Sequence, residues 1–70
     1  MSDPWNLTPR ERQTLTLLAE HGTGKIAARV MGISYRTLEK YVERAGEKMG
    51  EPHRLRMVVL WDRFARTAQT

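Results

Sequence analysis

A glycine followed two residues later by a serine divides the middle of this chain into two amphipathic segments. Residues 28–44 read Ala-Arg-Val-Met-Gly-Ile-Ser-Tyr-Arg-Thr-Leu-Glu-Lys-Tyr-Val-Glu-Arg. Gly32 can adopt the positive φ angle of a helix C-cap at little cost. Ser34 is a favoured N-cap, able to accept a hydrogen bond from the backbone N–H of Thr37. The stretch therefore predicts a helix, a tight turn and a second helix, which is the layout of a helix-turn-helix.

Similar start and stop signals predict the other helix boundaries. Thr8-Pro9-Arg10-Glu11 reads as an N-cap, a proline in the first turn and a capping box closed by Glu11. Gly22 suits the C-cap of that helix, and Gly50 with Pro52 ends a later one. The sequence thus predicts an all-α fold with a lead-in at 1–7 and one helix-turn-helix domain at 8–68, whose helices span about 8–21, 24–31, 34–49 and 52–67.

Apolar residues at helical spacing predict which faces are buried. In residues 34–49 one narrow stripe faces the core, formed by Leu38, Val42, Ala45 and Met49. The first helix has a stripe of Leu15, Leu18 and Ala19, and an apolar lid before it of Trp5 and Leu7. The last helix has a wider stripe of Met57, Leu60, Trp61, Phe64 and Ala68. Leu55 and Val59 lie nearly opposite that stripe, so they contact either the third helix or a second copy of the chain.

The composition favours a polyanion as the partner. Twelve Lys and Arg face eight Asp and Glu in 70 residues, for a net charge of +4, and small basic domains favour nucleic acid. The absence of cysteine excludes disulfides and Cys-based zinc sites. No apolar run reaches the roughly 18 residues of a membrane span, and the first residues do not resemble a signal peptide. We therefore expect a cytoplasmic protein, associated with the nucleoid through DNA and with no membrane partner.

Enzymatic chemistry finds little support in the residue pattern. His21 and His53 are far apart and have no paired ligands at metal-binding spacing. Ser2 and Ser34 lack a positioned His–carboxylate system. No glycine-rich phosphate loop is present. We expect no enzyme activity, no cofactor and no metal.

Charged residues on the outer face of the segment 34–49 are candidates for DNA contact. Arg36 and Lys40 point away from the predicted core, and such cations bind guanine O6 and N7 or phosphate. Lys25 can reach a phosphate at the start of the second helix, and Ser34 can both cap and bind. Tyr41 is either a backbone contact or an aromatic at the edge of the core. The predicted backbone contacts are Thr37, Tyr41, Arg44 and Lys48.

Several motifs together resemble one family of DNA-binding domains. Leu7-Thr8-Pro9-Arg10-Glu11-Arg12 is similar to the "L-T-x-R-E" opening of LuxR-type (GerE-like) domains. Residues 32–38, Gly-Ile-Ser-Tyr-Arg-Thr-Leu, resemble that family's "G-I-S-x-x-T-V", and residues 47–50, Glu-Lys-Met-Gly, its "x-K-L-G". The similarity runs over residues 7–66 in the family's order.

The resemblance implies a four-helix, stand-alone transcriptional regulator whose third helix enters the major groove of duplex DNA. It implies phosphate contacts from Thr37 and Tyr41 and base contacts from Glu39, Lys40 and Glu43. It also implies a homodimer through the fourth helix on an inverted repeat, with an interface that includes Leu55, Val58, Val59 and Asp62. Together with the residue pattern, it predicts a DNA-binding set of Lys25, Ser34, Tyr35, Arg36, Thr37, Glu39, Lys40, Tyr41, Glu43, Arg44 and Lys48.

The chain departs from the family pattern at a few positions. Ala27 stands where the family has a large apolar residue and Thr14 where it has Val, and we expect Ile26 and Val30 to compensate. Acidic residues at 39 and 43 replace the usual basic ones. Carboxylates repel phosphate, so on a groove face they make sense as acceptors from bases such as cytosine N4.

The same acidic residues favour an alternative function. In that interpretation the domain is a protein-interaction module, whose apolar residues dock on RNA polymerase or another regulator. Residues 44–49, Arg-Ala-Gly-Glu-Lys-Met, also resemble the helix end of sigma-factor region 4. A sigma-region-4-like factor that acts with RNA polymerase is therefore part of the alternative.

Overall fold

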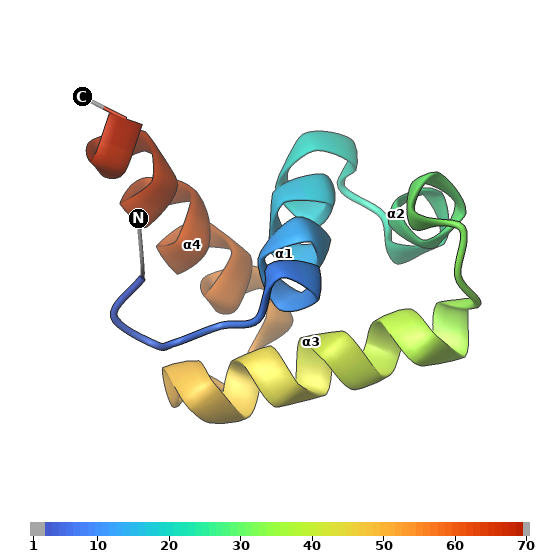
Figure 1. Cartoon of the computed structure of the whole chain (residues 1–70), viewed down its shortest axis with the longest axis horizontal. Helices are drawn as coiled ribbons and strands as arrows, with labels where there is room; N and C mark the ends of the chain where they lie inside the picture. Colours follow the sequence, from blue (N-terminus) through green and yellow to red (C-terminus); the bar gives the residue numbers. More distant parts are fainter. Residues whose placement is uncertain (1–2, 70) are drawn as a thin grey trace.

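Four helices make up the fold of this chain in a computed structural model that describes residues 3–69. They are α1 (Pro9–His21), α2 (Gly24–Met31), α3 (Tyr35–Met49) and α4 (Arg54–Gln69), and the described part contains no strand. Figure 1 shows α1 in the middle, with α4 on one side and α2 on the other, while α3 runs beneath them. The predicted all-α fold with four helices is confirmed.

Side chains and glycines end the helices at the predicted signals. Thr8 Oγ1 accepts from the Glu11 backbone N–H (3.2 Å), and Glu11 Oε1 accepts from the Thr8 N–H (2.9 Å), which closes the capping box. Ser34 Oγ accepts from the Thr37 N–H (3.1 Å) at the start of α3. Gly32 lies at φ 70°, and the next backbone N–H, that of Ile33, donates to the Ala28 carbonyl (3.0 Å). The turn between α2 and α3 therefore forms as predicted.

The fourth helix starts two residues later than the sequence analysis placed it. The first helical hydrogen bond runs from the Met57 N–H to the His53 carbonyl (3.0 Å). Glu51 stabilises this start, because its Oε2 accepts from the backbone N–H of His53 (3.1 Å). The same hydrogen bond is the main cause that lowers the pKa of the Glu51 carboxyl. The local turn around Pro52 thus uses two residues that the sequence analysis assigned to the helix.

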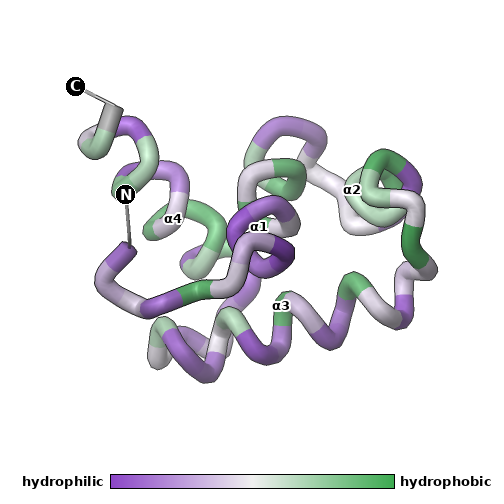
Figure 2. Tube along the Cα trace, in the orientation of Figure 1, coloured by the Kyte–Doolittle hydropathy of each residue, from purple (hydrophilic) through white to green (hydrophobic). Residues whose placement is uncertain are grey.

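The core consists of two clusters joined across α3 and α4. One cluster contains Leu7, Leu15, Ala45, Met57 and Trp61. The other contains Leu18, Ala27, Ala28, Met31 and Leu38. Val42 and Val58 pack against both clusters. Figure 2 shows the result on α3, where hydrophilic residues follow the outer edge and apolar residues face the other helices.

Several apolar positions differ from the expected pattern. Ala19 is exposed, and Thr14 takes a fully buried place on α1, since the inward face runs through 11, 14, 15 and 18. The Thr14 hydroxyl donates to the Arg10 carbonyl (2.8 Å), so its burial leaves no unsatisfied group. Leu60 was expected in the core stripe of α4 but is 38% exposed, because the buried edge of that helix follows Met57 and Trp61.

The second helix packs with a small residue, without the compensation expected from its neighbours. Ala27 is fully buried against Leu18 and Leu38, so α2 lies close to α1 and α3. Ile26 and Val30 are 42% and 56% exposed, because they lie outside the buried face formed by Gly24, Ala27, Ala28 and Met31. The expectation that these two residues fill the space next to Ala27 was wrong.

An aromatic cluster covers the open side of α4. Trp5 and Phe64 meet edge to face with ring centroids 5.6 Å apart, and Phe64 lies 5.7 Å from Trp61. The Trp61 indole Nε1–H donates to Thr16 Oγ1 (3.0 Å), which links α4 to α1. Leu7 is buried, and the carboxylate of Asp3 accepts from the backbone N–H groups of Trp5 and Leu7. The predicted lid of Trp5 and Leu7 is therefore confirmed.

Replacing Trp61 should lower the stability of the whole domain. We expect Trp61→Ala to reduce the free energy of unfolding by about 3–5 kcal/mol, because it removes a core aromatic ring. Trp61→Phe keeps a ring but loses the hydrogen bond to Thr16, and should lose about 1 kcal/mol of stability. Urea denaturation followed by circular dichroism at one protein concentration measures both changes. The exposed control Val30→Ala should stay within about 0.5 kcal/mol of wild type. An unchanged urea midpoint for Trp61→Ala would contradict the packing described here.

Candidate nucleic-acid interface

The outer face of α3 carries two parallel rows of charge. Residues four apart are neighbours on a helix surface. Arg36, Lys40 and Arg44 form the basic row; Glu39, Glu43 and Glu47 form the acidic row. All six residues are exposed, and none of them makes an ion pair within the described part of the chain. The opposite face of α3 is held by Leu38 and Ala45, which are fully buried, so both rows are presented to solvent.

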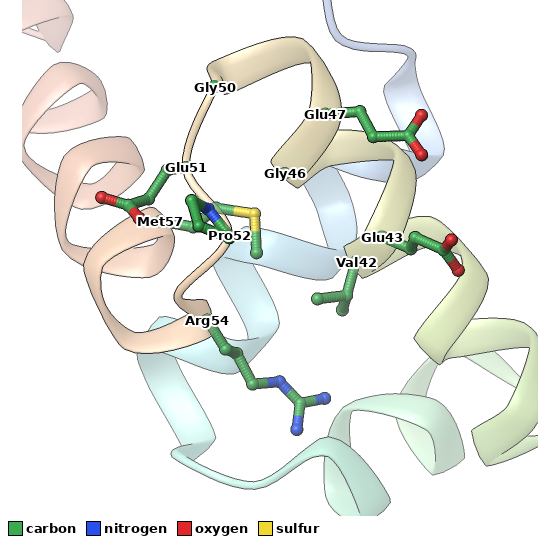
Figure 3. A pocket seen from close by; sticks show the side chains of 9 residues that line it. All are labelled: Val42, Glu43, Gly46, Glu47, Gly50, Glu51, Pro52, Arg54 and Met57. Carbon is green, nitrogen blue, oxygen red and sulfur yellow. The ribbon is translucent and has the colours of Figure 1, made fainter.

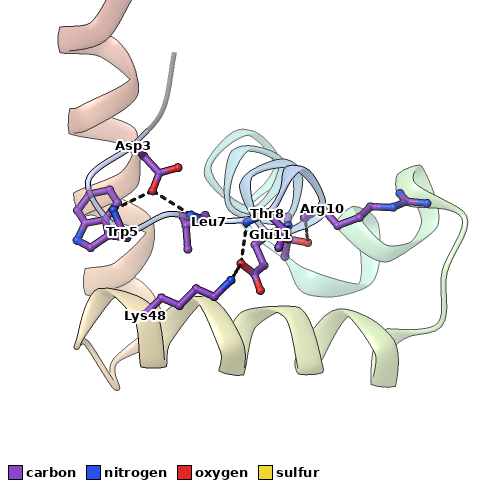
Figure 4. A network of polar contacts seen from close by, with 8 residues as sticks. Asp3, Trp5, Leu7, Thr8, Arg10, Glu11 and Lys48 are labelled. Atoms are coloured by element: carbon purple, nitrogen blue, oxygen red, sulfur yellow. Dashed lines mark hydrogen bonds and ion pairs between the residues drawn. The ribbon is translucent and has the colours of Figure 1, made fainter.

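Lys48 continues the register of the basic row but has a structural role. Its Nζ lies 2.8 Å from Glu11 Oε1 and donates to it, and the Glu11 side chain is 2% exposed (Figure 4). Burial by itself raises the pKa of the Glu11 carboxyl. The hydrogen bond and charge of Lys48 and the hydrogen bonds from Thr8 outweigh that effect, so the pKa lies below its ordinary value. This contact ties the end of α3 to the beginning of α1.

The other predicted contacts lie in the first turn of α2 and between the N-cap and the middle of α3. Lys25 is exposed in the first turn of α2. The Ser34 hydroxyl caps α3 and donates to Thr37 Oγ1 (3.0 Å), so capping uses this side chain. Tyr41 is half-buried, and it packs against the cluster around Leu38 at the edge of the core; its contact with the DNA backbone stays a prediction. Tyr35 is 39% exposed.

Gly24 permits a close contact among three helices. A Cβ atom at this position would lie 2.6 Å from Cε1 of Tyr35 and 2.9 Å from Nη2 of Arg54. Arg54 Nη1 also donates to the hydroxyl of Tyr35 over 3.4 Å. The first residues of α2, α3 and α4 therefore meet at one point, and the guanidinium group of Arg54 lies next to the start of α2. The sequence analysis assigned Arg54 no contact.

An open groove of about 450 Å³ lies between α3 and the connection to α4 (Figure 3). Val42, Gly46 and Met57 line it with apolar atoms, and Glu43, Glu47, Glu51 and Arg54 stand at its rim. Its lining offers no serine, cysteine or histidine as a nucleophile or base. Over residues 3–69, no three His, Cys, Asp or Glu side chains come together as metal ligands. The groove is therefore a surface feature beside the charge rows, with no catalytic constellation.

The fourth helix leaves part of its apolar surface in solvent. Leu55 is 76% exposed and Val59 45%, and neither is among the residues packed against the two core clusters. Val58 packs inward against both core clusters, and Asp62 accepts from Arg66 Nε one turn later (2.9 Å). Of the four residues predicted for a dimer interface, Leu55 and Val59 are thus the ones that present free apolar surface. None of the helices in the described residues has the length and apolar character needed to cross a membrane.

Comparison with known protein families agrees with this arrangement. The chain matches the family model described as bacterial regulatory proteins, luxR family, over residues 5–61 of its 70 residues. The chain belongs to the LuxR family of bacterial regulatory proteins. Neither the comparison with curated proteins nor the comparison with solved structures gave a match.

Membership of the LuxR family establishes the general character of the domain. LuxR-type domains are four-helix, helix-turn-helix units that bind DNA and regulate transcription, and they are regulatory and not enzymatic. In this LuxR-family chain, α2 (Gly24–Met31) and α3 (Tyr35–Met49) form the helix-turn-helix. The basic and acidic rows therefore lie on the exposed face of its second helix.

Breaking the contact between Glu11 and Lys48 should destabilise the domain in a pH-dependent way. We expect Lys48→Met to lower the free energy of unfolding at pH 7 by about 1–3 kcal/mol, because it leaves a buried carboxylate without its charged partner. Since the folded pKa of Glu11 lies below its ordinary value of 4.5, the stabilisation is full above pH 4.5 and is lost as the pH falls through the folded pKa. The difference between wild type and Lys48→Met should therefore shrink below pH 4.5.

Thermal and urea denaturation at several pH values measures that difference. Arg44→Met removes the same charge one turn earlier on α3, from a side chain without an ion pair, and should leave stability nearly unchanged. Equal stability of wild type and Lys48→Met at pH 7, or a difference that does not vary with pH, would contradict the assigned contact.

Proposed function

We propose that this domain reads specific sequences of duplex DNA, with α3 lying in the major groove. The observation that carries the proposal is the basic row, which stands exposed and unpaired on α3 while the opposite face is buried. Arg36 and Lys40 lie toward the N-terminal end of α3, the end from which recognition helices reach base edges. Lysine and arginine in this position bind phosphate or guanine.

Further contacts hold the DNA backbone on both sides of α3. Lys25 adds positive charge at the N-terminus of α2, where helix N–H groups attract phosphate. Thr37 and Tyr41 approach the backbone beside α3, as in the family, and Ser34, Tyr35 and Arg44 complete the set. We leave Lys48 out of this set, because its ammonium group already binds Glu11. Since the proposed partner is duplex DNA, we place the protein with the nucleoid in the cytoplasm.

We further propose that two copies bind together through α4 on an inverted repeat. Leu55 and Val59 are exposed and lie one turn apart, and the exposed Leu60 adjoins them. Burial of apolar side chains of this size by a second copy would stabilise a dimer. A twofold dimer would place its two copies of α3 about one DNA turn apart. The expected operator is therefore a pair of half-sites at that spacing.

A second candidate function is a docking module for RNA polymerase or another regulator. Exposed Ile26 and Val30 on α2 favour it, because they form an apolar pair that the fold does not use. Selection of bound duplexes from a random pool separates the two candidates. Enrichment of a sequence supports DNA readout, whereas failure to enrich any sequence at near-physiological salt would favour docking.

Removing cations from the basic row should weaken DNA binding without unfolding the domain. We expect Lys40→Ala and Arg36→Ala each to weaken binding to the selected operator by about 1–3 kcal/mol where they contact a base. Where they contact phosphate, each should reduce the slope of log K against log salt by about 0.9. Fluorescence anisotropy across a salt series measures both effects. As a control, Arg66→Ala removes the same charge at the far end of α4 and should change DNA binding little. Wild-type affinity in both Arg36→Ala and Lys40→Ala would refute the assignment of α3 to the major groove.

A charge in the exposed surface of α4 should separate the two copies. We expect Val59→Asp to remain folded and to sediment as a monomer, because a buried aspartate without a partner disfavours association. It should also lose the preference for two half-sites over one. Val30→Asp, at an exposed valine of α2, is the matched control and should leave the mass unchanged. A wild-type chain that stays monomeric both free and on the selected DNA would contradict the proposed dimer.

A further inference from the structure

The charges on the exposed face of α3 are sorted by sign. Like charges four residues apart within each row repel each other, whereas each cation lies three residues before a carboxylate of the other row, where opposite charges attract weakly. The acidic row also makes no ion pair with the basic row beside it. In Figure 3, Glu43 and Glu47 extend from α3 in the same direction, away from the apolar lining of the groove. These carboxylates are thus held in water at a helix face where negative charge opposes DNA.

The major groove offers a carboxylate few partners. Guanine presents two acceptors there, thymine presents an acceptor and a methyl group, and adenine presents its amino group next to the acceptor N7. Cytosine presents a donor, its N4 amino group, which a carboxylate accepts well. A glutamate in the groove therefore binds best next to cytosine, because the acceptors of the other bases repel its carboxylate.

We infer that Glu39 and Glu43 determine specificity by selecting cytosine in each half-site. The inference rests on the proposed function, and it adds the base that the carboxylates of the acidic row recognise. Both residues lie in the N-terminal two-thirds of α3, whereas Glu47 lies one turn nearer the end of the helix. Residues four apart are separated by about 6 Å along the helix axis, and successive bases by about 3.4 Å. The two selected cytosines should therefore lie about two base steps apart.

The carboxylates of Glu39 and Glu43 have opposite effects on non-specific and on specific DNA binding. Non-specific binding depends on attraction to phosphate, and every carboxylate near the backbone weakens it. Specific binding recovers that loss only where an amino group meets each carboxylate. Glu39 and Glu43 thus widen the ratio between operator and random DNA, even though they lower affinity for DNA in general.

Isosteric amides test the inference at single positions. Glutamine keeps the size of glutamate, removes the charge and pairs well with adenine N6 and N7. We expect selection with wild type to enrich two cytosines per half-site. In selection with Glu39→Gln or Glu43→Gln, one of these two positions should change from cytosine to adenine or should show no preferred base. Each variant should lose about 5- to 100-fold in affinity for the wild-type operator and gain affinity for random duplexes.

Glu47→Gln is the matched control, since it removes the same charge from the same row. It should leave the selected sequence unchanged, and its melting temperature and those of the other two variants should match wild type. A wild-type operator without cytosine at two such positions, or an unchanged motif in both variants, would overturn the cytosine assignment while DNA binding itself stands. Failure of wild type to enrich any duplex would instead overturn the proposed function and this inference with it.

Discussion

The buried carboxylate of Glu11 joins the start of one helix to the end of another, and the position of α3 depends on it. Its Oε1 accepts from the Thr8 backbone N–H at 2.9 Å and from Lys48 Nζ at 2.8 Å. One atom thus closes the capping box of α1 and binds Lys48 of α3, which lies 37 residues later in the sequence. Burying a carboxylate is unfavourable unless its partners are in place. A wrong arrangement of the helices would leave the Glu11 carboxylate buried without its partners, so this group favours the native arrangement. In the native arrangement, no buried side-chain polar atom of the described residues lacks a hydrogen-bond partner.

Fixing α3 in this way matters because its exposed face carries no net charge. Three cations of the basic row face three carboxylates of the acidic row, so the net charge of +4 arises elsewhere on the chain. In the proposed function, the basic row therefore attracts DNA less than three cations alone would, and Lys25, which lies outside the two rows, adds to the attraction. A face of balanced charge is useful for reading bases only when each side chain is placed accurately against the groove.

Local signals in the sequence predicted the ends of α1, α2 and α3 and the turn, whereas the burial of side chains depended on tertiary packing. Thr8, Ser34 and Gly32 act within three or four residues, so their effect can be predicted without the fold. The burial of Thr14 in place of Ala19 depends on how α1 is rotated against its neighbours. The contact of Lys48 with Glu11 joins distant residues that share no periodic pattern. For the same reason the candidate DNA set could be named from helical spacing and family resemblance, but the structural role of Lys48 could not.

The contact among Gly24, Tyr35 and Arg54 links the beginning of α4 to the helix-turn-helix. Arg54 is the first residue of α4, and its guanidinium lies against the first residue of each of the other two helices. A Cβ atom at position 24 would force the Tyr35 ring and the Arg54 guanidinium to move. A second copy packed on Leu55 and Val59 would rest on a helix that is packed against α1 and α3. The separation of two recognition helices would then follow from rigid packing, with no flexible linker between the dimer contact and the reading face, and such a pair can select half-sites by their spacing as well as by their sequence.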